Sequence, residues 1–253
     1  MIKRKKILSD KSVENLILTI SNCNTLYVRY NSVCPHMWSF FYKPEDKPAN
    51  SLERYLSLFP SIFDIKEKIY GYEWWYRSLP EDQKSKPFHF DCDEELRVNK
   101  GFYKSPLLTT ITYLTDDGAP TIVNNIQVEN NNVSSEYNKI SLCPPKTGYI
   151  ASFPAKNAHG VVVPENPTNN RKALIVNVWT DYLNGELVRY NVKDDLIIET
   201  LNNDWETPPE TTLENYPKEW CKIDNYSFRQ PFDLPQDQYV TFNTDNELVE
   251  YEK

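Results

Sequence analysis

Residues 106–128 read PLLTTITYLTDDGAPTIVNNIQV, and this stretch decides the fold class. Two runs rich in β-branched and aromatic residues, 106–115 and 121–128, flank the segment Asp116-Asp117-Gly118-Ala119-Pro120. β-Branched and aromatic side chains suit a pleated, half-buried strand, whereas Asp, Gly and Pro favour turns. The stretch therefore predicts two β-strands joined by a hairpin-type connection.

Runs of the same kind recur on both sides of this stretch. From about residue 69 the chain shows eight short segments bounded by Pro, Gly, Asp or Asn, at 70–78, 87–91, 106–115, 121–128, 148–153, 160–163, 173–180 and 186–192. About eight strands in regular succession indicate a sandwich, a barrel or a jelly roll. The predicted fold is therefore mainly β.

The remaining segments carry helical and irregular patterns. Apolar residues recur at helical spacing after possible cap residues, at Val13, Leu16, Ile17 and Ile20 after Ser9, Asp10 and Ser12. Further predicted elements are a strand at 25–30, a helix beginning in 51–59, a capping box at 61–64 and a late helix at 194–201. We expect a single domain over 1–253, with helical support at 1–68, a β-core at 69–192 and a C-terminal helix and wrapping tail at 193–253.

Composition and charge exclude several classes of protein. The net charge of −8 argues against nucleic acid as the main partner, and no apolar segment is long enough for a transmembrane helix. The basic run Lys3–Lys6 fits either a targeting patch or a frayed, solvated tail. Five scattered cysteines, with no CxxC pair and no signal peptide, fit reduced thiols and predict a cytoplasmic protein.

Two of the three histidines lie in informative patterns. Side chains alternate across a strand, so His89 and Asp91 in the segment Pro87-Phe88-His89-Phe90-Asp91 face one side. An imidazole and a carboxylate so placed can occupy adjacent positions on one cation. His159 opens another predicted strand, 159 − 91 = 68 residues after Asp91, which leaves room for the intervening strands of a jelly roll.

Two histidines and one carboxylate form the facial triad of non-haem Fe(II) oxygenases, which leaves three positions of the iron open. A structural zinc site would instead be closed by four ligands. The ordinary alternative is chance, because a His-x-Asp pattern is common and a single histidine is more often a surface residue or a satisfied polar group.

A basic residue after His159 strengthens the metal hypothesis. Arg171 lies 171 − 159 = 12 residues after His159 and begins the strand-like run RKALIVNVW, residues 171–179. Alternation gives a mixed face, Arg171, Ala173, Ile175, Asn177 and Trp179, and a mainly apolar face, Lys172, Leu174, Val176 and Val178. We expect the apolar face on packed core and the mixed face on a cavity, where a guanidinium would bind a carboxylate bidentately. The alternative is an arginine at a strand edge with a partner on the surface.

Together these patterns resemble the double-stranded β-helix (jelly-roll, cupin-like) core of Fe(II)/2-oxoglutarate-dependent dioxygenases, and within that superfamily the prolyl-hydroxylase-like branch. The likeness covers residues 87–180. Four ordered blocks carry it: His89-Phe90-Asp91, residues 107–121, residues 145–154 running into His159-Gly160-Val161, and residues 171–179. The segment after Gly118 departs from the branch, because it lacks the paired glycines usual there.

The resemblance implies an iron site and a cosubstrate site. The iron ligands would be His89, Asp91 and His159. The contacts to 2-oxoglutarate would be Arg171, at the distal carboxylate, with Tyr113, Thr109 and Asn177. Lys172 is a rival to Arg171, since some relatives use lysine, and Ala173 stands where the family often has a small hydroxyl residue. For Tyr113 and Thr109 the alternative is a polar residue on an exposed strand face.

Asp91 also bears on the type of chemistry. In halogenating relatives a small residue replaces this carboxylate, so the resemblance implies hydroxylation or a related C–H oxidation, with Fe(II), 2-oxoglutarate and O₂ consumed to give succinate and CO₂. We expect a small-molecule substrate, such as an amino acid or a natural-product precursor. The candidate substrate contacts are Tyr72, Trp74, Tyr76 and Arg97. The alternatives are hydroxylation of a protein side chain such as proline, and a non-catalytic cupin-like protein that binds metal or ligand.

Overall fold

The structure is a computed structural model. It describes residues 2–21, 39–79, 86–116, 118–129, 132–133, 140–161, 171–185, 187–211, 226–227, 240–242 and 248–250. The strand predicted at 25–30, together with His36, Cys23, Cys34 and Cys221, lies outside the described residues.

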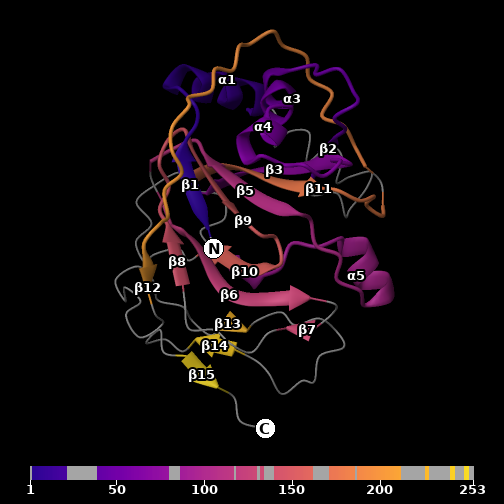
Figure 1. The fold of residues 1–253 in the computed structure, drawn as a ribbon, viewed down its shortest axis with the longest axis vertical. Coiled ribbons are helices and arrows are strands. Elements are labelled where there is room, and N and C mark those ends of the chain that lie inside the picture. The colour runs from indigo at the N-terminus through magenta and orange to yellow at the C-terminus, as the bar shows by residue number, and fades with distance from the viewer. Residues whose placement is uncertain are drawn as a thin grey trace.

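Two antiparallel sheets form the body of the fold (Figure 1). The first has the order β1-β9-β5-β11-β3-β2, with strands Lys3–Lys6, Tyr149–Phe153, Leu108–Tyr113, Arg171–Trp179, Gly71–Leu79 and Phe40–Tyr42. The second has the order β12-β8-β6-β10-β4, with strands Glu210–Thr211, Ile140–Cys143, Thr121–Glu129, Asn157–Val161 and Lys86–His89. β7 (Asn132–Val133) pairs with β6, and a separate sheet contains β13 (Tyr226–Ser227), β14 (Val240–Phe242) and β15 (Leu248–Glu250).

The chain crosses repeatedly between the two main sheets, which makes the fold a jelly roll. β4, β6, β8 and β10 belong to the second sheet, whereas β5, β9 and β11 belong to the first. One buried cluster fills the space between the sheets and joins Ile111 and Ile175 of the first to Val123 and Cys143 of the second. The predicted fold class, a mainly β jelly roll with flanking helices, is confirmed.

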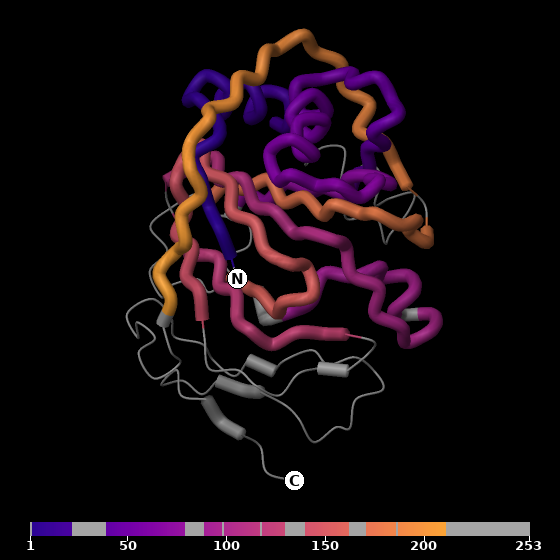
Figure 2. The backbone as a smooth tube through the Cα atoms, viewed as in Figure 1, coloured from indigo at the N-terminus to yellow at the C-terminus, as the bar shows by residue number. Residues whose placement is uncertain are grey.

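Among the described residues, three helices cover the outer face of the first sheet (Figures 1 and 2). They are α1 (Asp10–Ile20), α3 (Ser51–Leu56) and α4 (Phe59–Phe63). The Ser9 side chain caps α1 by accepting a hydrogen bond from the backbone of Ser12. The apolar residues of the helices pack against Leu174, Val176 and Val178 of β11. The predicted first helix and the packed apolar face of 171–179 are therefore confirmed.

The hairpin predicted at 116–120 is wrong. β5 pairs with β9 and β11, whereas β6 pairs with β7, β8 and β10, so the connection carries the chain from one sheet to the other. Gly118 enters this connection with a φ of +103°, and a Cβ at this position would lie 2.5 Å from the Cβ of Arg171. Turn residues indicate where a chain bends but not which strands pair afterwards.

The prediction of a targeting patch or solvated tail at Lys3–Lys6 is also wrong. These residues form β1, which pairs with β9 from Lys3 opposite Ser152 to Lys6 opposite Tyr149. Lys5 is buried, and its ammonium lies 4.7 Å from the centre of the Trp205 ring. Long aliphatic stems and ring contacts let basic residues occupy a sheet edge.

Residues 194–201 do not form the predicted helix, because other elements satisfy their backbone groups. Asn15 of α1 donates to the Ile197 carbonyl at 2.8 Å, and the Leu201 N–H donates to the Ile7 carbonyl at 2.7 Å. Residues 187–192 likewise form no strand. The capping box at 61–64 is wrong as well, since α4 ends there and Asp64 adopts a left-handed conformation at its C-terminus.

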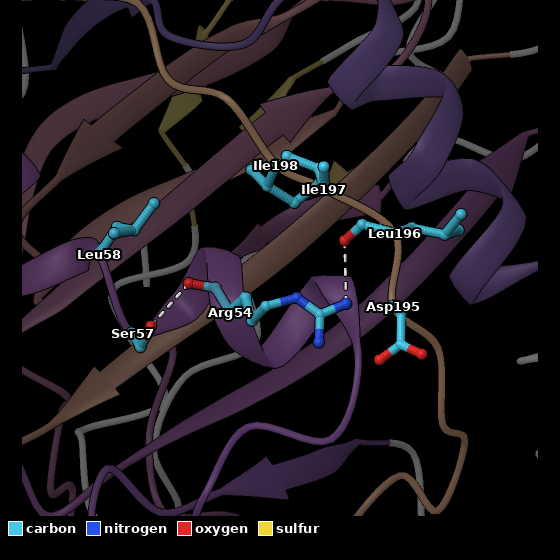
Figure 3. Close-up of a pocket in the computed structure, with 7 residues that line it drawn as sticks. All are labelled: Arg54, Ser57, Leu58, Asp195, Leu196, Ile197 and Ile198. Carbon is cyan, nitrogen blue, oxygen red and sulfur yellow. Dashed lines mark hydrogen bonds between the residues drawn. The ribbon is translucent and has the colours of Figure 1, made fainter.

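Among the described elements, the sequence patterns missed one helix, α5 (Glu94–Lys100), and the strands β1, β2, β7, β8, β12, β13, β14 and β15. A surface hollow of about 520 Å³ lies between α3 and residues 195–198, in the helical layer (Figure 3). Arg54 lines this hollow but is engaged there, since it donates to the Leu196 carbonyl at 2.9 Å.

Within the described residues no helix is long and apolar enough to cross a membrane.

Candidate metal centre and anion site

His89 and His159 are brought together by strand pairing. β4 and β10 are antiparallel neighbours in the second sheet, and His89 lies directly opposite His159. Their ring centres are 4.4 Å apart. Directly opposed residues in a sheet project to the same face, so both imidazoles point in one direction.

Asp91 completes a cluster of three candidate ligands. Asp91 follows the end of β4, and its Oδ1 lies 3.7 Å from His89 Nε2 while its Oδ2 lies 3.4 Å from His159 Nε2. One ligand atom from each of the three residues lies within 4.8 Å of the others. Atoms that bind one ion at about 2.1 Å and at right angles lie roughly 3 Å apart. The cluster is therefore close to the spacing of a facial triad.

The hydrogen bonding of His159 suits metal binding. Its Nδ1 lies 3.1 Å from the carbonyl oxygen of Asn157. A carbonyl only accepts, so Nδ1 carries a hydrogen and Nε2, 3.4 Å from Asp91 Oδ2, is the ring atom available to a metal ion. A ligand histidine typically donates its second N–H to such an acceptor, which fixes its tautomer and ring orientation.

The electrostatics of the cluster favour an ionised Asp91. Burial alone would raise the pKa of this carboxyl, but the neighbouring His159 and His89 and a hydrogen bond from Thr109 hold it well below its ordinary value. His89 has 26% of its side chain exposed, against 7% for His159 and 5% for Asp91. The cluster is therefore reached from the side of His89.

Arg171 is a buried cation with an unused donor. Arg171 is only 3% exposed. Its Nη2 donates to Thr121 Oγ1 at 3.0 Å, and its guanidinium lies 5.6 Å from the centre of the Tyr113 ring. Its Nε is buried without a hydrogen-bond partner, and no Asp or Glu of the described residues forms a salt bridge with it. Desolvation accordingly lowers the pKa of Arg171. Burial of such a group costs free energy of folding unless an anion compensates its charge.

The guanidinium lies a short distance along the second sheet from the histidines. Val123 of β6 is opposite His159, and Thr121, which binds Arg171, lies two residues before Val123. Two residues along a strand span about 7 Å on the same face. A dicarboxylate of about five carbons could therefore reach from the metal cluster to Arg171.

Each further predicted cosubstrate contact is engaged within the protein. The Tyr113 hydroxyl lies 2.8 Å from Thr121 Oγ1 and 3.0 Å from the Cys143 carbonyl, next to Arg171. Thr109 Oγ1 lies 2.8 Å from Asp91 Oδ2 and 2.9 Å from Asn177 Oδ1. Neither side chain lies on an exposed strand face, since both are fully buried. Thr109 thus contacts the metal cluster itself.

The predicted substrate contacts on β3 need correction. Tyr72 and Trp74 have no exposed surface and pack with the helical layer, and Tyr76 packs against the same cluster. The opposite face of β3 carries Glu73 and Trp75, which are paired with Asn177 and Ile175 of β11. The side chains of Tyr72, Trp74 and Tyr76 therefore point away from the metal cluster. They form part of the packed core under the helices.

The prediction of Arg97 as a substrate contact also needs correction. It lies on α5, and its Nη2 donates to Glu94 Oε1 of the same helix at 2.9 Å. This carboxylate already occupies the guanidinium that was expected to meet a substrate. Glu73, on the inner face of β3, is not among the predicted substrate contacts, although a charged residue within an aromatic strand was a usable signal.

No family model and no curated protein matches the chain. Among solved structures it is similar to a prolyl-4-hydroxylase from Pseudomonas putida, with 12% identity, a TM-score of 0.45, and 70% of this chain and 85% of the other covered. It is also similar to HygX from Streptomyces hygroscopicus, solved with nickel and 2-oxoglutarate bound, with 12% identity, a TM-score of 0.39, and coverage of 77% and 93%. A third is AviO1 from Streptomyces viridochromogenes, with 14% identity, a TM-score of 0.38, and coverage of 69% and 86%.

Proposed function

We propose that this protein is an Fe(II)- and 2-oxoglutarate-dependent oxygenase that hydroxylates, or otherwise oxidises at a C–H bond, a small-molecule substrate. His89, Asp91 and His159 hold the iron, and Arg171 binds the distal carboxylate of 2-oxoglutarate. When bound, the iron with 2-oxoglutarate and O₂ supplies the oxidising power, and succinate and CO₂ are released.

The observation that carries the proposal is the buried, unpaired Nε of Arg171 beside a His-Asp-His cluster. A metal cluster alone fits many proteins, and a buried arginine alone fits a structural role. A cation that lacks an anion, placed about two strand residues from the cluster, fits a ligand that carries carboxylates at both ends.

The residues of the chain divide the remaining work. Thr121 and Tyr113 hold the Arg171 guanidinium in place from β6 and β5. Thr109 and the Asn157 carbonyl orient Asp91 and His159. The exposed edge of His89 marks the side on which a substrate approaches.

Anaerobic titration with Fe(II) and 2-oxoglutarate tests the proposal directly. We expect the weak visible charge-transfer band that arises when a 2-oxo acid chelates Fe(II). Coupled turnover with candidate small molecules should then release succinate in a substrate-dependent manner. A protein that binds Fe(II) but shows neither the band nor succinate release would be a non-catalytic metal-binding jelly roll.

Replacement of Asp91 by alanine is the matching prediction for the metal cluster. We expect Asp91→Ala to abolish the charge-transfer band and to lower succinate formation by at least about 100-fold, because two neutral ligands hold Fe(II) poorly. The control is Asp194→Ala, in the helical layer, where the carboxylate binds Arg54. Full activity in Asp91→Ala would show that the ligand assignment is wrong.

A further inference from the structure

A buried carboxylate lies two side chains away from the metal cluster. Glu73 of β3 is directly opposite Asn177 of β11, and Asn177 is directly opposite Thr109 of β5. The three residues thus form one transverse row across the first sheet. The row ends at Asp91, whose Oδ2 lies 2.8 Å from Thr109 Oγ1.

The row is continuous in hydrogen bonds and excluded from solvent. Asn177 Nδ2 lies 3.3 Å from Glu73 Oε2, and Asn177 Oδ1 lies 2.9 Å from Thr109 Oγ1. Trp179 Nε1 donates to Glu73 Oε2 at 3.1 Å, and Ser39 Oγ donates to Oε1 at 2.8 Å. All members of the row are buried.

Glu73 has no cation to balance it. Among the described residues no lysine or arginine forms a salt bridge with its carboxylate. Desolvation raises its pKa to about 7, and the charge of Asp91 adds to the rise. An apolar side chain at this position would cost less free energy of folding than a buried carboxylate. The presence of Glu73 therefore indicates a role other than packing.

We propose that Glu73, Asn177 and Thr109 form a positioning chain that orients the Asp91 carboxylate, so that Glu73 sets the affinity for the metal without touching it. The inference rests on the proposed function only in taking Asp91 as a metal ligand. Hydrogen bonds to a ligand carboxylate fix its orientation, and a bond to Oδ2 leaves Oδ1 for the ion.

Counting hydrogens shows how Glu73 acts. The Thr109 hydroxyl has one hydrogen but faces two acceptors, Asp91 Oδ2 and Asn177 Oδ1. If the Asn177 amide is turned over, its Nδ2 donates to Thr109, and the Thr109 hydrogen goes wholly to Asp91. Asn177 Oδ1 then faces Glu73, which must be protonated to donate to it. A protonated Glu73 therefore completes one direction of donation that ends on Asp91.

The test uses Co²⁺ as the probe and its d–d absorption as the readout. Thr109→Val and Asn177→Leu break the chain, and we expect the dissociation constant for Co²⁺ to rise about tenfold in each. Thr112→Val is the matched control. Thr112 is equally buried on the same strand but faces the helical layer, where it bonds to the Tyr55 hydroxyl at 2.9 Å. We expect this control to lose stability but to keep the wild-type dissociation constant.

The variant Glu73→Gln tests the far end of the chain, because glutamine has nearly the shape of the acid but does not titrate. The side chains that bond to Glu73, from Ser39, Asn177 and Trp179, do not titrate, and Asp91 stays ionised. We expect the ratio of the Co²⁺ dissociation constants of Glu73→Gln and the wild type to change between pH 6 and pH 8, because only the wild type titrates at this position.

Two results would overturn the positioning chain: equal Co²⁺ binding by Thr109→Val and the wild type, or a Glu73→Gln ratio that does not change with pH. Equal losses in Thr109→Val and Thr112→Val would also overturn it, since the effect would then be structural. If the wild type binds no Co²⁺ at all, it is the proposed metal centre that fails.

Discussion

Two buried charges of opposite sign lie on the inner face of the first sheet, and neither has an ion-pair partner among the described residues. Arg171 is close to Thr121 and Tyr113, and Glu73 is bonded to Asn177 and Trp179. Burial of an unpaired charge costs free energy of folding. At residue scale, these costs are the clearest sign that the interior of the jelly roll serves binding as well as stability.

Arg171→Met tests whether the buried guanidinium is held for a ligand. Without ligand, we expect the free energy of unfolding to rise by about 1–3 kcal/mol, because an unpaired buried cation is replaced by an apolar chain. The stabilisation that 2-oxoglutarate gives to the metal-loaded wild type should disappear. Thermal unfolding with and without 2-oxoglutarate measures both effects. Lys172→Met is the control, since Lys172 is on the opposite face, and it should keep the ligand response.

Glu73→Gln should change how stability depends on pH. The pKa of Glu73 is raised from 4.5 to about 7 in the folded protein. Between these pH values Glu73 is therefore protonated in the folded state but ionised in the unfolded state. The free energy of unfolding of the wild type therefore falls as pH rises from about 4.5 to 7. The glutamine variant does not show this decrease, because glutamine does not titrate. We expect the variant to gain up to about 3 kcal/mol relative to the wild type across this window. Urea unfolding at pH 5 and pH 8 gives the difference, and a constant difference would contradict the prediction.

At the scale of single elements, alternation predicted which residues share a face but not always which face turns inward. On β11 the contrast between an apolar and a mixed face gave the orientation, and Leu174 and Val176 do pack under the helices. On β3 the outward face is the more aromatic one, so Tyr72 and Trp74 were wrongly expected in the pocket. The helical layer that recruits them comes from residues 10–63, which the strand pattern does not reveal.

Gly118→Ala tests the connection between β5 and β6. The glycine has a φ of +103°, and an added Cβ would lie 2.5 Å from the Cβ of Arg171, so the arginine must move. We expect the dissociation constant for 2-oxoglutarate to rise roughly tenfold while Co²⁺ affinity stays unchanged. Gly185→Ala is a matched control, because it has a φ of +92° but meets only the end of the Glu95 side chain. Equal effects in the two variants would mean that general strain, not Arg171, is responsible.

At the scale of the whole molecule, the order of most strands along the chain was predictable, whereas much of the long-range pairing was not. His89 and His159 are brought opposite each other by β4 and β10, as a jelly roll requires. The conformations of β1 and of the irregular segment 194–201 depend on hydrogen bonds to residues far away in the sequence. Local sequence patterns cannot predict such partners.

Removal of residues 1–8 distinguishes a structural strand from a solvated tail. The segment buries Ile2, Ile7 and Leu8 completely or nearly so and covers the edge of β9. We expect the loss of these side chains to cost about 5 kcal/mol, which is comparable with the whole stability of many domains. Size-exclusion chromatography should show aggregation through the exposed edge. A truncated protein that remains monomeric with an unchanged melting temperature would contradict this expectation.

The pairing of β1 with β9 also governs the order in which the chain can be completed during synthesis. β1 is synthesised long before Tyr149–Phe153, its partner strand, and the partner of Arg4, Glu206, is synthesised later still. At a translation rate of about 5–20 residues per second, β9 follows β1 after roughly 7–30 s. During that time Ile2, Ile7 and Leu8, which are buried in the folded structure, lack the strand against which β1 pairs, so this segment folds only after most of the described chain has been synthesised.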